Sequence, residues 1–375
     1  MSTAKGRVAE LQTLRGVAAA VVMLYHPLSI APAPWRERVA FDAVINAHAA
    51  VIVFFVLSGY VLQATLAQRP QSLIAFYVRR AFRIYPAVIT ATAFALLVVS
   101  VMISLVPKSA GWLSDELMVR QLAGIDLALC FLAVSSSLIT PLWTVIVEIV
   151  GSACMPLISL AGRSRIIGPA LVIVLAVMSP LLMNAEPLLL ASLGYLVNFA
   201  VGAGIYRITP GLQDLALRRP RLTVLVMVGA AFGLLFSRLV VKLLMFHHLT
   251  PLVTLYYDPW LSLIETIWAG LLIAAIVACP NGVGVLRIPF AMFLGDISFS
   301  VYLLHYPVML AVASGLSLVQ GYDLGGAYAP VVLALLTAAV TIPLAWINFR
   351  LIETPGIALG KAFSSLAGRP APARA

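Results

Sequence analysis

Long apolar segments dominate this chain and limit what it can fold into. About ten stretches of some 20 mostly apolar residues follow one another, each long enough to cross a bilayer as a helix. They lie near residues 10–28, 46–67, 84–106, 142–161, 166–182, 188–207, 222–243, 260–279, 291–316 and 329–351. Because 62% of the residues are hydrophobic and only 10% are charged, a soluble domain is excluded. The sequence predicts an all-α fold, a polytopic integral membrane bundle of about ten transmembrane helices.

Basic residues indicate how these helices are oriented. If the amino terminus is cytoplasmic, most of the 24 Lys and Arg fall on the cytoplasmic side. Counting the apolar stretch 121–139 as a further span would invert every later basic loop, so we interpret it as a re-entrant or interfacial segment. The net charge of +10 then reflects topology and contact with membrane lipid, and nucleic acid is not an expected partner. We expect one membrane domain over residues 1–356 and a short, disordered cytoplasmic tail at 357–375.

The first apolar segment contains Arg15 and His26, two residue types that membrane helices rarely carry. Eleven positions along a helix make about three turns, which puts both side chains on one face, about 16 Å apart along the axis. Arg15 inside the segment and the missing small-residue cleavage site argue against a signal peptide. Two interpretations remain open: the pair marks the two membrane interfaces, or it forms a line of cationic groups facing the interior.

A basic block, FYVRRAFRIYP at 76–86, comes just before the third apolar segment. Arg79 and Arg83 are an i, i+4 pair and Arg80 lies three positions before Arg83, so their guanidinium groups project from neighbouring helix faces. Arginine binds phosphate bidentately, so the block is suited to hold a phosphorylated donor at the cytoplasmic side. The alternative is a positive-inside signal that serves topology alone.

Glu148, in PLWTVIVEIVG, places a carboxylate inside an apolar segment, where it is costly without a partner or a polar cavity. The expected topology puts it in the outer half of the bundle together with His26. We therefore expect Glu148 to orient that imidazole and to stabilise its protonated form; the alternative is a structural hydrogen bond. Glu265 and Asp296 are weaker candidates.

The ninth segment reads GDISFSVYLLHYPV and places Tyr302 and His305 three positions apart, on one helical face. A lone histidine in a membrane helix is usually a packed structural residue, but His305 is the second one in this chain. No role is assigned to His48. His247 and His248 are expected to be surface residues, since no third metal ligand is spaced near them.

Six motifs together resemble the membrane acyltransferase 3 family in order and spacing: LQTLRGVAAAVVMLYH, FFVLSGYVL, FYVRRAFRIYP, PLWTVIVEIVGSACMP, GDISFSVYLLHYP and LIETP, covering residues 10–355. Members of that family look like ten-helix membrane proteins that move an acyl group, usually acetyl, from cytoplasmic acyl-CoA to hydroxyls of extracytoplasmic sugars. The resemblance implies an O-acetyltransferase of the bacterial inner (plasma) membrane with both termini cytoplasmic. Acyl-CoA would be the donor and a polysaccharide, lipopolysaccharide or glycolipid the acceptor. No permanently bound cofactor and no metal is expected.

Acyl transfer to a sugar hydroxyl needs a base for the hydroxyl proton and a clamp for the donor. We assign His26 as general base and Glu148 as its orienting partner. The CoA moiety is expected to be held by Arg15, Arg79, Arg80 and Arg83. Further pocket candidates are Ser58, Trp143, Tyr302 and His305. Whether His26 carries the acyl group covalently stays open.

Two further expectations concern smaller features. Ser58, and Gly59 beside it, are equally suited to close helix packing. The outer stretch 107–141, with Trp112, Glu116 and Arg120, is the best candidate for contact with the sugar. Its aromatic residue beside mixed charges suits a pyranose ring.

Three other classes of membrane protein share some of these features. A polysaccharide or lipid transporter or flippase has as many spans, but it does not require a histidine and a glutamate at matching depth. An intramembrane serine protease could pair Ser58 with His305, although Val56 replaces the expected glycine two positions before the serine. A membrane glycosyltransferase needs clustered acidic residues in the first outer loop, where only Glu37 and Asp42 lie. Each class explains one feature and leaves the others without a role.

Overall fold

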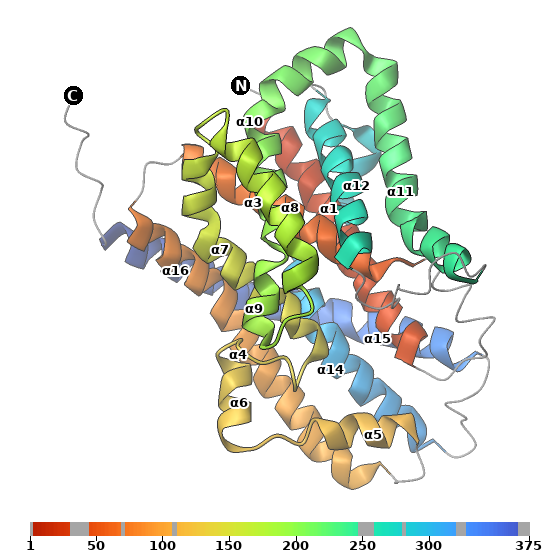
Figure 1. Ribbon diagram of the computed structural model, residues 1–375. Coiled ribbons are helices and arrows are strands. Elements are labelled where there is room, and N and C mark those ends of the chain that lie inside the picture. Colours follow the sequence, from red (N-terminus) through yellow and green to blue (C-terminus); the bar gives the residue numbers. More distant parts are fainter. Residues whose placement is uncertain are drawn as a thin grey trace. The chain divides into compact units, whose positions relative to one another are not determined.

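The computed structural model describes residues 3–30, 45–68, 72–106, 111–246, 259–279, 283–319 and 328–366. These residues form helices joined by turns, and none of them belongs to a strand. The predicted all-α fold is therefore confirmed (Figure 1).

Eight helices among the described residues are long and apolar enough to cross a membrane. They are Ala47–Gln68, Leu73–Leu105, Thr140–Ala161, Leu188–Arg218, Pro220–Val240, Pro259–Ala278, Ser298–Ser317 and Ala329–Ser365. Each overlaps one of the ten predicted segments. The chain is a multi-pass membrane protein.

The two remaining predicted segments are helical as well. Segment 10–28 lies within α1 (Thr3–Ile30), and segment 166–182 is α8 (Ile167–Leu182). At about 1.5 Å per residue, the 16 residues of α8 reach about 24 Å, less than the hydrocarbon thickness of about 30 Å. The stretch 121–139 contains the short helix α6 (Gly124–Phe131), which supports its exclusion from the spans.

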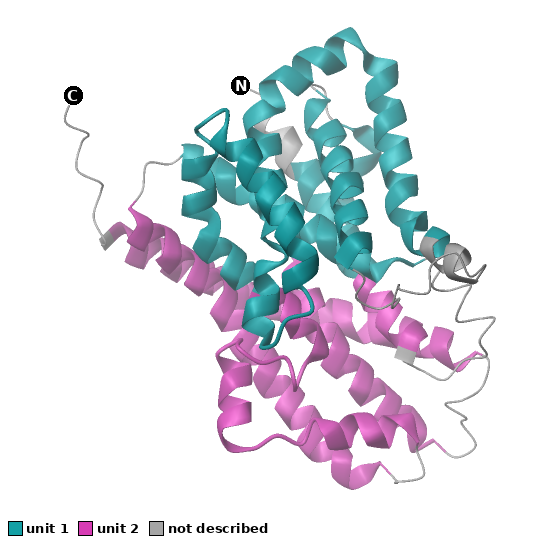
Figure 2. Ribbon diagram, viewed as in Figure 1, with its two compact units in different colours: residues 1–21, 42–69, 147–296 teal, residues 22–41, 70–146, 297–375 magenta. Residues whose placement is uncertain are grey.

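The chain divides into two compact units (Figure 2). Unit 1 comprises Met1–Val21, Asp42–Arg69 and Val147–Asp296; unit 2 comprises Val22–Phe41, Pro70–Ile146 and Ile297–Ala375. Each unit has its own packed core.

Unit 1 is built around α3 (Ala47–Gln68), α10 (Leu196–Arg218) and α12 (Pro259–Ala278), which pack against one another. Its other elements are α8, α9 (Leu188–Leu193), α11 (Pro220–Phe246), η3 (Gly284–Arg287), α13 (Pro289–Asp296), the part of α7 (Trp143–Ala161) from Val147 on, and the part of α1 up to Val21.

Two glycines bring the backbones of α3 and α10 together. A Cβ atom on Gly59 would lie 2.2 Å from the backbone oxygen of Phe199, and one on Gly202 would lie 2.0 Å from that of Val56. Because no side chain fits into these gaps, only glycine permits this approach. Gly59 therefore serves helix packing, the alternative considered for the FVLSGY motif.

Unit 2 is built around α4 (Leu73–Leu105) and α14 (Ser298–Ser317). Helix α14 packs on α4 and on α15 (Ala329–Asn348), and α16 (Thr354–Leu366) lies along α4. Shorter elements complete this unit: α5 (Trp112–Val119), α6, η2 (Thr140–Leu142), the part of α7 up to Ile146, the π-helical turn η4 (Phe349–Glu353) and the part of α1 from Val22 on.

The prediction of a disordered tail from residue 357 is wrong for its first part, because α16 is helical as far as Leu366. Two tertiary contacts hold it against α4. The Phe363 ring stacks on Phe82 with centroids 5.3 Å apart, and Arg79 Nε donates to Ser364 Oγ over 2.8 Å. Residues 367–375 lie outside the described residues.

Candidate active site

Two histidines of unit 2 are in direct contact. Helix α1 carries both Arg15 and His26, as predicted, and His26 lies one turn after Val22, the first residue of unit 2. His26 Nδ1 lies 3.2 Å from Nε2 of His305, which is completely buried on α14. The two histidines that stood out in the apolar segments therefore form one hydrogen-bonded pair.

Backbone carbonyls determine which ring nitrogens of the pair carry hydrogen. A carbonyl oxygen only accepts, so His305 Nδ1, 3.2 Å from the Val301 oxygen, must donate. A neutral His305 then accepts at Nε2. His26 Nδ1 faces this acceptor and, at 2.9 Å, the carbonyl oxygen of Val22, so it also carries a hydrogen. In the neutral pair, His26 therefore presents its lone pair at Nε2, as a general base requires.

Tyrosine rings surround the two imidazoles. The Tyr306 ring meets His26 edge-on at a centroid distance of 5.5 Å, and the Tyr302 ring lies 5.7 Å from that of His305. The Tyr302 hydroxyl donates to the Pro141 carbonyl over 3.2 Å. The prediction that Tyr302 and His305 share a face of one helix is confirmed.

A buried arginine anchors Tyr306. Arg120, 6% exposed, donates from Nη2 to the Tyr306 hydroxyl over 2.6 Å and to Thr140 Oγ1 over 2.5 Å, and it forms an ion pair with Glu116 at 2.8 Å. The Tyr306 hydroxyl in turn donates to Glu116 over 3.1 Å. Because its charge is compensated by Glu116, the guanidinium is tolerated in the interior of the protein.

Of the stretch 107–141, expected to contact the sugar, the described residues 111–141 are thus tied to the histidine pair through Tyr306. The sequence did carry a signal for this cluster. Glu116 and Arg120 are spaced i, i+4, as helical ion pairs are. Their partner on α14, however, lies 186 positions from Arg120 along the chain.

Glu148 and Ser58 belong to unit 1. Ser58 Oγ on α3 donates to Glu148 Oε1 on α7 over 3.5 Å, a long hydrogen bond, and both side chains are half-buried. His26 belongs to the other unit, so its predicted pairing with Glu148 stays a prediction. Trp143, the first residue of α7, belongs to unit 2.

The arginine block lies within α4, not before it, since α4 begins at Leu73. Arg79, Arg80 and Arg83 are all half-buried, as is Arg15 on α1. Arg79 uses its Nε hydrogen on Ser364. A role of the block in phosphate binding stays a prediction.

Comparison with known proteins gives a family. Residues 8–350 match a protein-family model described as an acyltransferase domain. No curated protein and no solved structure matches the chain. The matched region contains nearly the whole chain, including both histidines of the pair. The protein therefore belongs to the acyltransferase 3 family and is a membrane acyltransferase.

Proposed function

We propose that the protein is an integral membrane O-acyltransferase that moves an acetyl or similar short acyl group from cytoplasmic acyl-CoA to a hydroxyl of an extracytoplasmic carbohydrate. The acceptor class is a polysaccharide, lipopolysaccharide or glycolipid. The observation that carries this proposal is the hydrogen-bonded pair of His26 and His305, because transfer to a hydroxyl needs a base with an available lone pair.

In the proposed reaction, His26 Nε2 takes the proton of the sugar hydroxyl while the hydroxyl oxygen attacks the thioester carbonyl. The carbon–sulfur bond then breaks, and His26 returns the proton to the leaving thiolate. During the transfer His26 is an imidazolium, and its Nδ1 hydrogen still points to two acceptors, the Val22 oxygen and His305 Nε2. Hydrogen bonds to a charged group are stronger than neutral ones, so His305 stabilises the charge as it develops. Glu148 is proposed to add compensating charge.

The donor is proposed to be held by arginines. Guanidinium groups bind phosphate bidentately, which suits Arg15, Arg79, Arg80 and Arg83 to the phosphates of CoA. We place the protein in the bacterial inner membrane with both termini cytoplasmic, so that these arginines face the acyl-CoA pool. A transporter without acyl-transfer chemistry would leave the histidine pair without a role.

His26→Ala tests the proposal. Removing the general base should lower acyl transfer by about 100- to 10,000-fold. Two readouts apply: the O-acetyl content of the cell-surface glycan, and transfer of label from acetyl-CoA by the purified protein in nanodiscs. Ser314→Ala is the control, since Ser314 belongs to the same unit, is buried on α14 and donates to the Leu310 carbonyl of its own helix. Normal acetyl content with His26→Ala would contradict the assignment.

A further inference from the structure

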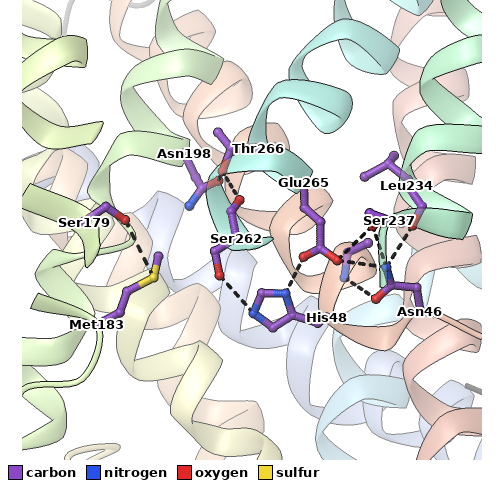
Figure 3. A network of polar contacts seen from close by, with 11 residues as sticks. Asn46, His48, Ser179, Met183, Asn198, Leu234, Ser237, Ser262, Glu265 and Thr266 are labelled. Carbon is purple, nitrogen blue, oxygen red and sulfur yellow. Dashed lines mark hydrogen bonds and ion pairs between the residues drawn. The ribbon is translucent and has the colours of Figure 1, made fainter. Parts of the chain in front are cut away.

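A second polar cluster lies entirely within unit 1 (Figure 3). It joins the start of α3 to α11 and α12 and has no part in the mechanism above. Glu265 on α12 is completely buried and Ser262, on the same helix, is 1% exposed. A carboxylate inside a membrane helix is costly unless it has partners, so the groups that contact Glu265 indicate its role.

Glu265 accepts hydrogen bonds on both oxygens. Oε2 accepts from Nδ1 of His48, and Oε1 accepts from Asn46 Nδ2 over 2.8 Å and from Ser237 Oγ over 3.3 Å. The carboxylate is therefore oriented by three donors from two other helices or their caps. Because it accepts from His48 Nδ1, it also determines which nitrogen of that imidazole carries hydrogen.

The opposite nitrogen of His48 faces a hydroxyl. His48 Nε2 lies 3.3 Å from Ser262 Oγ and, with Nδ1 protonated, accepts the serine hydrogen. Ser262 and Glu265 are three positions apart on α12, so both lie on the helix face that meets His48. The order hydroxyl, imidazole, carboxylate is the one that activates a serine nucleophile, and such contacts are often this long in unliganded enzymes.

We propose that Ser262, His48 and Glu265 form a second acyl-transfer site, in which Ser262 carries the acyl group as an ester. This inference rests on the proposed function in taking an acyl thioester as donor. His48 Nε2 takes the Ser262 proton as Oγ attacks the thioester carbonyl, and the carbon–sulfur bond breaks as His48 gives that proton to the thiolate. An acceptor hydroxyl then attacks the ester, His48 takes its proton, and Ser262 Oγ receives the proton as it leaves.

The exposure of His48 and the burial of Glu265 suit this role. His48 is the accessible member, with 14% of its side chain exposed, whereas Glu265 is fully enclosed. Reactants therefore approach from the imidazole side, while the carboxylate stays shielded from solvent. A hydroxyl in a helix can also be satisfied locally, as Ser192 is by the Leu188 carbonyl over 2.8 Å, without an imidazole or a buried charge.

The experiment uses the purified full-length protein in nanodiscs and two probes. Radiolabelled acetyl-CoA should leave one acetyl ester on the peptide that contains Ser262 after an acid quench, located by mass spectrometry. A fluorophosphonate should label the same serine without any acyl donor. Both signals should fall at least tenfold in Ser262→Ala and His48→Gln and persist in Ser192→Ala, a control because Ser192 is fully buried in unit 1 and donates to the Leu188 carbonyl.

Folding of each variant is followed by thermal unfolding, and Ser262→Cys keeps a nucleophile in place should Ser262→Ala fail to fold. A thioester adduct on the introduced cysteine would support the site. Wild-type protein that acylates glycan but shows neither acetyl ester nor fluorophosphonate on Ser262 would overturn it. Fluorophosphonate labelling of Ser262 without any glycan acylation by the wild type would support the second site and count against the proposed function.

Discussion

Replacing His305 by leucine is expected to slow acyl transfer by about 10- to 150-fold. The substitution introduces an apolar side chain of similar volume and removes the acceptor that lies 3.2 Å from His26 Nδ1. A hydrogen bond from a charged donor contributes about 1.5–3 kcal/mol, and this one becomes charged only when His26 has taken the hydroxyl proton. At about 1.36 kcal/mol per tenfold change in rate, this contribution corresponds to the loss of about 10- to 150-fold. Because the charged hydrogen bond forms only during the reaction, the loss falls on kcat and leaves the KM for acyl-CoA nearly unchanged.

The loss should be smaller than for His26→Ala, because the Val22 carbonyl still accepts from His26 Nδ1 and maintains the tautomer. His305→Gln is the rescue variant, since its amide oxygen can replace the imidazole acceptor; it should recover to within about tenfold of the wild type. The assay is thiol release from acetyl-CoA by protein in nanodiscs, with the surface polysaccharide fraction of the host as acceptor. Activity of His305→Leu within about twofold of the wild type would refute the reasoning. So would a glutamine variant no better than the leucine variant at equal thermal stability.

Two further predictions concern unit 1. Glu148→Gln should lower kcat by about tenfold or more if the carboxylate compensates charge on His26; an equal loss in Ser58→Ala would instead indicate that Glu148 acts by holding Ser58. Gly202→Leu should lower the thermal unfolding midpoint in detergent. No rotamer of the new side chain avoids the Val56 backbone, because the Cβ atom itself would clash with it, so the backbone must move at a cost of about 1–3 kcal/mol. Unchanged stability of that variant would mean that α3 and α10 separate at no cost.

Segment length and hydropathy sufficed to predict where most helices lie, since each membrane helix forms its backbone hydrogen bonds within itself. The tail was different. The composition of its end, SSLAGRPAPARA, predicted disorder. The stacking of Phe363 on Phe82, however, holds α16 against α4, and this helix continues to Leu366. That contact is tertiary and has no local signature.

In the candidate sites, too, the sequence indicates single residues but not the tertiary contacts between them. Histidines in apolar segments are conspicuous, so both members of the pair were found, yet 279 positions separate them and the sequence did not indicate that they meet. His48 was left without a role and Ser262 was missed. The spacing of Ser262 and Glu265 was visible, but their shared partner lies more than 200 positions away and reaches them only through the packing of α3 on α12.

The two histidines differ in how their charged forms are stabilised, and this bears on whether the acyl group is carried covalently. Within unit 2, His26 shares its Nδ1 hydrogen with two neutral acceptors, so compensating charge for its imidazolium has to come from Glu148, as proposed. Without that carboxylate, His26 suits a proton transfer that is over as soon as the thiolate leaves. His48 contacts a buried carboxylate, and the imidazolium formed when Ser262 attacks is neutralised in place. On this difference we expect direct transfer at His26 and a covalent step at Ser262. If Glu148 proves to pair with His26, the difference disappears, and a covalent intermediate becomes equally favourable at either histidine.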